Sequence, residues 1–128
     1  MPAYDILRFS PPAPLATVAL RDSTSGAIWT NLSMLLDTGA DVTLLPTECL
    51  SRLGVSADRS QMYELMGFDG SRSTVAAIQL DLIFLEQTFR GRFLLIDQAE
   101  GILGRDVLNH LSLLFDGPRL VWQKAPAS

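Results

Sequence analysis

The chain contains 128 residues, of which 48% are hydrophobic and 19% are charged, and its formal net charge at pH 7 is -4. This composition suits one domain with a single apolar core, and the 10 basic residues, outnumbered by 14 acidic ones, form no patch that would bind nucleic acid or an anionic membrane. The single cysteine, Cys49, excludes an intrachain disulfide, and because His110 is the only histidine we predict no metal site and no cofactor.

Residues 1–14 are predicted to form a proline-rich N-terminal arm, because they hold four of the seven prolines. We expect this arm to be extended, with a short strand at Tyr4–Phe9. Asp5 and Arg8 interrupt the apolar run that a signal peptide needs, and no uncharged apolar stretch is long enough to cross a bilayer. We therefore expect a cytoplasmic protein with no membrane partner.

Alternation of apolar and polar residues predicts β-strands through most of the remaining chain. Turn-forming stretches separate these strands, among them DSTSG at 22–26, the glycine-rich MGFDGSRS at 66–73 and DGPR at 116–119. The expected strands are Leu15–Arg21, Ala27–Leu36, Val42–Leu45, Gln61–Leu65, Thr74–Leu80, Gln79–Leu85, Thr88–Ile96, Leu113–Phe115 and Leu120–Trp122.

Two segments are predicted to be helical. Glu48–Leu53 is short and lies between Thr47, a good N-cap, and Gly54, a good C-cap. Arg105–Leu111 has apolar residues at helical spacing and is the best helix in the chain, and the GILG stretch before it, Gly101–Gly104, is expected to be a tight apolar turn. The fold class is therefore mostly β, a small barrel or sandwich of about eight or nine short strands with one C-terminal helix, in one domain over residues 15–128.

The stretch MLLDTGADVTLLP, residues 34–46, places polar residues between two apolar runs. Asp-Thr-Gly is ordinary turn chemistry, in which Asp accepts local hydrogen bonds and Gly tolerates a positive φ. However, the flanking apolar runs are expected to draw the carboxylate of Asp37 inward, where a charged group needs donors such as Thr38 or the loop backbone. Either the loop is a simple turn, or the core holds Asp37 where it can act.

LLDTGADVTLLP resembles the active-site loop of the retropepsin-like aspartic proteases, a family of single-domain, homodimeric enzymes. GILGRDVLNHL, residues 101–111, is similar to the second element of that family, and MGFDGSRS lies where the family carries its flap. The three elements follow in the family's order, and the resemblance covers Leu15–Trp122. It implies an acid-protease-like closed barrel that forms a two-fold symmetric homodimer.

The resemblance also implies an activity, aspartic-type hydrolysis of peptide bonds in a peptide or protein substrate. This chemistry needs two carboxylates that share one proton. The chain has a single D-[ST]-G loop, so the second carboxylate must be Asp37 of a second copy, placed about a two-fold axis. In the family the chain termini interleave into one sheet across that axis, and we expect the C-terminal strands to form the dimer interface.

The family's functional positions carry over onto this sequence residue by residue. The catalytic positions are Asp37, Thr38, whose hydroxyl would bridge to the second copy while buried at the axis, and Gly39. Gly104 and Arg105 are expected to support the loop, Arg105 through a bidentate ion pair with Asp41. The substrate-binding positions are Ala40, Asp41, Met66, Gly67, Phe68 and Ile102.

Two other functions compete with an active protease. A catalytically inactive retropepsin-like dimer would keep the fold and serve as a peptide-binding or assembly module. A domain in which DTG is only a turn would remain a monomer at high concentration. The flap also departs from familiar viral flaps, with fewer consecutive glycines and the charged residues Asp69 and Arg72 near its tip, which leaves its closure and its substrate preference open.

Overall fold

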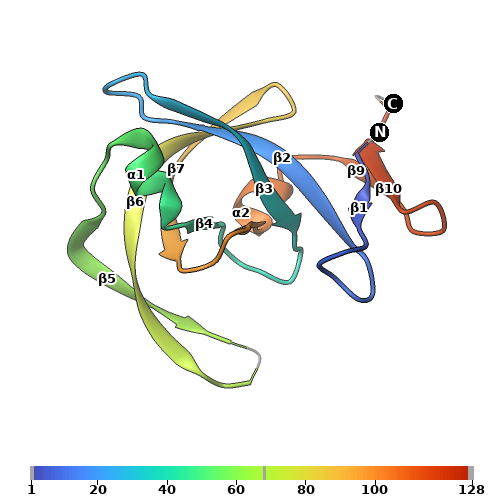
Figure 1. Cartoon of the computed structure of the whole chain (residues 1–128), viewed down its shortest axis with the longest axis horizontal. Helices are drawn as coiled ribbons and strands as arrows, with labels where there is room; N and C mark the ends of the chain where they lie inside the picture. Colours follow the sequence, from blue (N-terminus) through green and yellow to red (C-terminus); the bar gives the residue numbers. More distant parts are fainter. Residues whose placement is uncertain (1, 68, 127–128) are drawn as a thin grey trace.

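The structure is a computed structural model that describes residues 2–67 and 69–126. Eight strands form one sheet in the order β1-β2-β3-β8-β4-β7-β6-β5, and two more form a separate hairpin (Figure 1). The strands are β1 (Tyr4–Asp5), β2 (Ala13–Arg21), β3 (Ile28–Leu36), β4 (Leu44–Pro46), β5 (Asp58–Met66), β6 (Arg72–Phe84), β7 (Gln87–Ile96), β8 (Gly101–Leu103), β9 (Leu113–Asp116) and β10 (Val121–Lys124). The helices are α1 (Glu48–Leu53) and α2 (Arg105–Leu108).

A second pairing of β2 closes the sheet into a barrel. β2 pairs antiparallel with β3 along one edge and with β6 along the other, over Ala19–Arg21. The ring therefore runs β2-β3-β8-β4-β7-β6 and returns to β2, which confirms the prediction of a small closed barrel. β1 and β5 extend from this ring as additional strands, and both lie outside the closed part.

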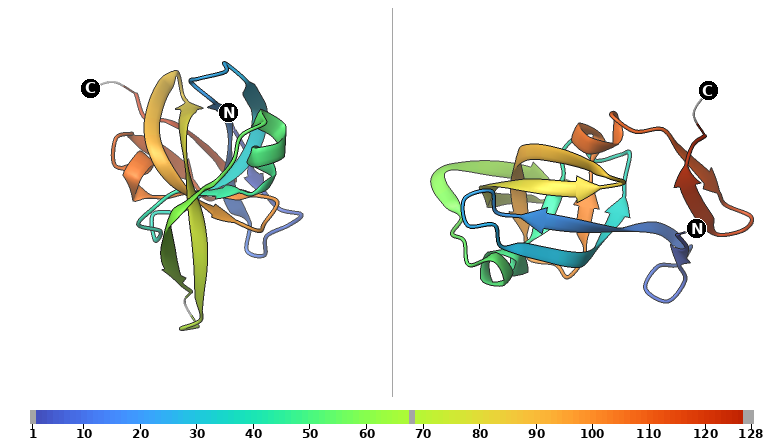
Figure 2. Two further views of the ribbon diagram at one scale, coloured as in Figure 1. Left: turned by 90° about the vertical axis from the view of Figure 1, so that its left-hand side faces the viewer. Right: turned by 90° about the horizontal axis from the view of Figure 1, so that it is seen from above.

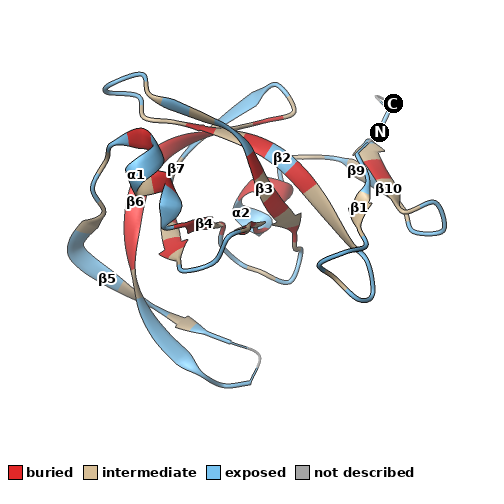
Figure 3. Ribbon diagram, viewed as in Figure 1, coloured by how far each residue is buried: buried red, intermediate tan, exposed pale blue. Residues whose placement is uncertain are grey.

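Buried apolar residues of the core alternate with less buried residues along β2 and β3, as Figure 3 shows. No helix in the described part of the chain is long and apolar enough to cross a membrane. The largest fully buried core side chains are Leu20, Met34, Leu45, Leu80, Leu82, Leu103, Val107 and Trp122.

One buried carboxylate lies at the seam where β2 meets β6. Asp81, on β6, is 3% exposed. Its Oδ2 accepts a hydrogen bond from the guanidinium of Arg21 on β2 (3.0 Å), and its Oδ1 lies 3.4 Å from Nε of Arg90 on β7. Two positive charges from the two neighbouring strands thus compensate the cost of removing this carboxylate from water.

The predicted helices both form, but the second is shorter than expected. α2 ends at Leu108 rather than at Leu111. Beyond Leu108 the N–H groups of His110 and Leu111 bond to carbonyls three residues back, at 3.0 and 3.1 Å. These tight turns keep the apolar residues at helical spacing but lack the i to i-4 hydrogen bonds of an α-helix. The spacing alone therefore predicted a helix that continues to Leu111.

Three strand predictions were wrong in detail. Thr74–Leu80 and Gln79–Leu85 are parts of one 13-residue strand, β6, whose first residues belong to an exposed hairpin and whose remainder belongs to the barrel. The expected turn at Gly101–Gly104 is instead strand β8, which lies between β3 and β4. The expected strand at Tyr4–Phe9 is limited to β1, which pairs with Ala13 and Pro14 of β2.

The C-terminal hairpin β9–β10 stands apart from the barrel, next to the N-terminal residues (Figures 1 and 2). It is anchored by Trp122, which is 2% exposed and packs against Phe84 with ring centroids 5.9 Å apart. The indole N–H of Trp122 donates to the carbonyl of Leu15, at 2.8 Å. This one side chain therefore joins β10 to β2 and β6.

We predict that Trp122→Ala lowers the free energy of unfolding by about 3–5 kcal/mol, because it leaves a large cavity and an unpaired Leu15 carbonyl. Trp29→Ala is the matched control, since Trp29 is only partly buried and contacts the exposed Arg52. Urea unfolding followed by circular dichroism at one protein concentration measures both. Equal losses in the two variants would contradict the anchoring role of Trp122.

Candidate active site

The DTGA loop leaves the barrel where two parallel strands end. β3 runs parallel to β8 with Leu36 opposite Leu103, and the N–H of Asp37 donates to the carbonyl of Leu103 at 3.1 Å. Asp37 and Gly104, the residues that follow the two strands, therefore lie at the same end of the barrel. The loop then returns to the barrel as β4, which pairs with β8 from the other side.

Gly104 permits a close approach between the loop and the start of α2. A Cβ atom at this position would lie 2.5 Å from the backbone of Val42 and 3.0 Å from the carbonyl oxygen of Ala40. The N–H of Arg105 donates to that same carbonyl, at 2.9 Å. Any side chain at position 104 would therefore push the loop away from β8, so glycine is required for steric reasons.

The carboxylate of Asp37 is half-buried and is held by its own loop. Its Oδ1 accepts a hydrogen bond from the N–H of Gly39 (2.9 Å), and its backbone carbonyl accepts one from the N–H of Ala40 (3.2 Å). Thr38, which was expected to be buried at a dimer axis and to serve as a donor, is exposed in the single chain. Within residues 2–67 and 69–126 its hydroxyl makes no hydrogen bond to Asp37, so that hydroxyl is available to a second molecule.

Arg105 fastens the loop mainly through the backbone. One guanidinium nitrogen, Nη1, donates to the carbonyl of Thr38 at 2.8 Å. The expected ion pair with Asp41 is present, but as a single 3.7 Å contact and not as a bidentate pair, and the Asp41 side chain is 88% exposed. Because an exposed pair of this length contributes little stability, the bond to Thr38 is the stronger restraint.

A second brace, missed in the sequence, lies behind the loop. Thr43 is fully buried, and its hydroxyl donates to Oδ1 of Asp106 at 2.6 Å while accepting from the N–H of Gly104 at 3.1 Å. The N–H of Thr43 donates to Oδ2 of Asp106, at 3.0 Å. Both carboxylate oxygens of Asp106 thus hold the end of the DTGA loop. The one available signal was the spacing in VTLL, where Thr43 shares a strand face with Leu45.

The hairpin β5–β6 projects from the barrel, and its tip lies on the same side of the molecule as the DTGA loop (Figures 1 and 2). The tip is closed by the N–H of Gly67, which donates to the carbonyl of Ser71 at 2.8 Å, and Gly70 has a φ of +83°. Met66 is 65% exposed. The flap prediction for Met66 and Gly67 thus falls on a hairpin tip, whereas Phe68 lies outside the described residues.

An ion-pair cluster fixes the base of this hairpin to the barrel. Arg92 on β7 contacts the carboxylate of Asp58 and donates to the hydroxyl of Tyr63 at 3.2 Å, both on β5. Hydrogen bonds from the Ser60 hydroxyl and backbone, together with Arg92, lower the pKa of Asp58 from 3.8 to about 2. The Asp58 carboxylate therefore stays ionised above roughly pH 3, and its ion pair with Arg92 is lost only as pH falls toward 2.

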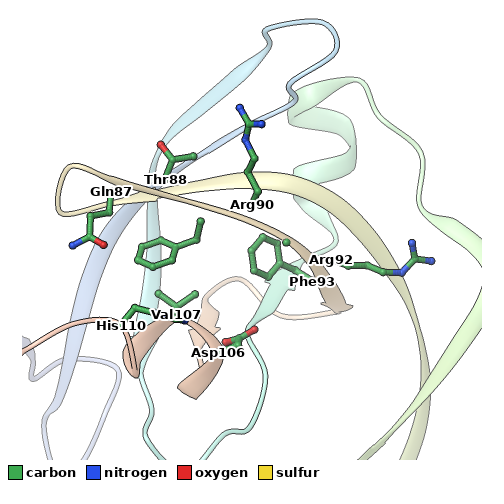
Figure 4. Close-up of a pocket in the computed structure, with 10 residues that line it drawn as sticks. Gln87, Thr88, Arg90, Arg92, Phe93, Asp106, Val107 and His110 are labelled. Atoms are coloured by element: carbon green, nitrogen blue, oxygen red, sulfur yellow. The ribbon is translucent and has the colours of Figure 1, made fainter.

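One pocket is lined by no residue of the DTGA loop. It has a volume of about 510 Å³ and opens between β7 and α2, with Phe89, Phe93 and Val107 among its lining residues (Figure 4). The guanidinium groups of Arg90 and Arg92 point out of it, toward their carboxylate partners. None of the predicted site residues lines this pocket.

The structure brings together the predicted residues of the loop and those of its support. Ile102 is paired with Leu35, two residues before Asp37, and Gly104 and Arg105 contact the loop backbone directly. No hydrogen bond in the described residues joins the hairpin tip to the loop. The arrangement presents one half-exposed carboxylate on a loop that is fastened at both ends.

We predict that Thr43→Val lowers the free energy of unfolding by about 1–3 kcal/mol, because it keeps the shape of the side chain but leaves the buried N–H of Gly104 without its partner and removes one hydrogen bond to the carboxylate of Asp106. Thr47→Val is the matched control, since Thr47 is exposed and its side chain makes no capping hydrogen bond. Thermal or urea unfolding measures the difference. A Thr43→Val protein as stable as the control would exclude the brace.

Comparison with known proteins agrees with this geometry. The sequence profile of one family, described as aspartyl protease, matches residues 23–107. Among solved structures, the EIAV protease complexed with the inhibitor HBY-793 superposes with a TM-score of 0.62 at 28% sequence identity, over 81% of this chain and 89% of that one. No curated protein matches the chain. The chain therefore belongs to the aspartyl protease family, and its fold is the retropepsin-like fold of the retroviral proteases.

Proposed function

We propose that the protein is a homodimeric aspartic endopeptidase whose two catalytic carboxylates are Asp37 of each copy. The observation that carries this proposal is the placement of Asp37, half-buried and fixed by Leu103 and Gly39, on a loop that occurs once in the chain. One such carboxylate is half of the machinery that this chemistry needs. The exposed Thr38 and Gly39 beside it leave room for the same loop of a second copy.

In the proposed reaction, one Asp37 carboxylate is ionised and removes a proton from a bound water, while the other is protonated and donates its proton to the oxygen of the scissile carbonyl. The water oxygen bonds to the carbonyl carbon. The bond from that carbon to the peptide nitrogen then breaks as the nitrogen takes the proton that the first Asp37 removed from water. The second Asp37 regains a proton from a hydroxyl on the same carbon, which yields a carboxylic acid and an amine. The brace from Arg105 and the Thr43–Asp106 pair would keep both carboxylates in place.

The substrate proposed is a peptide bound in extended form between the DTGA loop and the β5–β6 hairpin, with main-chain hydrogen bonds to the hairpin. Exposed apolar side chains on both sides support a preference for apolar residues near the scissile bond. Val42 follows the loop and is 38% exposed, and Met66 at the hairpin tip is 65% exposed. Asp41, whose exposed side chain carries a negative charge, would face polar groups toward the ends of the bound peptide.

We predict that Asp37→Asn abolishes cleavage of a diverse peptide library, with a loss of at least about 10³-fold in rate, because an amide can neither accept the proton from water nor share one. Dimerisation should persist, since the substitution keeps the size of the side chain. Mass spectrometry of the digest and sedimentation measure the two properties. Asp41→Asn is the control for loss of charge beside the loop. A wild-type protein that dimerises but cleaves no peptide would instead favour the inactive binding module.

We also predict that activity depends on protein concentration. Below the dissociation constant of the dimer, tenfold dilution should lower the activity per chain about tenfold, because only dimers hold two carboxylates. Adding an equal amount of Asp37→Asn chains to the wild type at saturating concentration should remove about half of the activity through mixed dimers. Activity per chain that is independent of dilution and of the added variant would contradict a shared site.

A further inference from the structure

The loop between β1 and β2, residues 6–12, lies at the end of the barrel that carries the DTGA loop. β2 is antiparallel to β3 with Leu15 opposite Leu35, so β2 begins where β3 ends, just before Asp37. Figure 1 shows this loop, in blue, on the same lower side of the molecule as the DTGA loop and the tip of the β5–β6 hairpin. Residues 6–12 precede the stretch that matches the aspartyl protease family, residues 23–107, so the match assigns them no role.

The carboxylate of Asp5 holds the β1–β2 loop in one shape. Its Oδ1 accepts hydrogen bonds from the N–H groups of Leu7 (2.8 Å) and Arg8 (2.9 Å), and its Oδ2 accepts one from Nε of Arg8 (2.6 Å). These bonds, above all the one from the backbone of Arg8, lower the pKa of the Asp5 carboxyl below its usual value. Asp5 therefore stays ionised above about pH 4 and keeps all three bonds over that range.

Arg8 also fastens the loop to the segment that leads into β8. Its Nη1 contacts the carboxylate of Glu100, which lies two residues before Ile102, an expected substrate-binding residue. The two carboxylates that Arg8 contacts are largely covered, since the side chains of Asp5 and Glu100 are 12% and 24% exposed. The loop is thus fixed beside an expected part of the peptide site, and its acidic groups are already paired.

The exposed chemistry of the loop is apolar. Ile6 is 61% exposed and Leu7 is 92% exposed, although both are large hydrophobic residues. Covering such side chains with another apolar group removes apolar surface from water, which is favourable. Because the loop is already held in place, a ligand that binds there does not have to order it first.

We propose that Ile6 and Leu7 bind an apolar side chain of the substrate peptide, and that Leu7 is a specificity-determining residue. The inference rests on the proposed function, because that function supplies the peptide. β8, which carries Ile102, pairs with one edge of β3, whereas the β1–β2 loop extends from β2 on the other edge. The loop therefore meets the peptide at an outer position and not at the two residues that flank the scissile bond.

The test compares the cleavage of a diverse peptide library by the wild type and by Leu7→Arg, with mass spectrometry of the products. We expect Leu7→Arg to lose about tenfold in kcat/KM for peptides with an apolar residue at one outer position. It should gain activity on peptides with Asp or Glu at that position, because the new charge attracts them. Preferences at the two residues that flank the scissile bond should not change.

Ile28→Arg is the matched control. Ile28 is also an exposed large hydrophobic residue, at 52%, but it starts β3 opposite Arg21, at the end of the barrel away from the DTGA loop. The same change of an apolar side chain to a positive charge at this position should therefore leave the cleavage profile as in the wild type.

A binding assay reads the same preference without cleavage. Asp37→Asn and the double variant Asp37→Asn with Leu7→Arg are immobilised, and the peptides that each retains from the library are sequenced. The first protein should retain peptides with an apolar residue at the outer position, and the second should retain peptides with an acidic residue there.

The outcomes separate this inference from the proposed function. A wild type that cleaves, while Leu7→Arg keeps the wild-type profile in both assays, would overturn the role of the loop and leave the protease intact. Leu7→Arg that sediments as a monomer while the wild type dimerises would do the same, because Leu7 would then contact the second copy. A wild type that cleaves nothing, while the two immobilised proteins retain different peptides, would overturn the proposed function and leave the role of the loop standing.

Discussion

The position of the DTGA loop depends on one backbone contact, between Gly104 and the stretch Ala40–Val42. A Cβ atom at position 104 would lie 2.5 Å from Val42, so the loop can rest against the end of β8 only because that residue has no side chain. Once the two backbones are this close, the N–H of Asp37 reaches Leu103 and the N–H of Arg105 reaches Ala40. The hydrogen bonds of Thr43 and Asp106 then close the loop from behind.

This contact also explains how a small barrel produces a rigid site. β8 has only three residues, yet it pairs with β3 on one side and with β4 on the other. The strands that enter and leave the loop are thus both fastened to the same short strand. The β5–β6 hairpin, in contrast, is fastened near its base by Arg92, while its tip is closed by its own hydrogen bonds. The molecule therefore combines a braced DTGA loop with a hairpin whose tip, among the described residues, makes no hydrogen bond to that loop.

Much of the fold could be predicted from the sequence because its strongest signals are local. The β2–β3 hairpin follows from alternating residues around a polar turn, and the DTGA loop from a carboxylate between two apolar runs. β8 could not be found in this way, since its three residues, Gly101–Leu103, are too few to show periodicity and form a strand only through partners about 60 residues away. The Thr43–Asp106 brace was missed for a similar reason, as 63 residues separate its two members.

The seam of the barrel has a consequence for how the sequence can vary. Asp81 uses each of its two oxygens for a different arginine, Arg21 from β2 and Arg90 from β7. Loss of either arginine alone leaves the buried charge with one partner, whereas loss of the carboxylate removes the partner of both arginines. Related chains should therefore tolerate substitutions at either arginine more readily than at the aspartate. A single mutation of one arginine would then leave the barrel closed between β2 and β6.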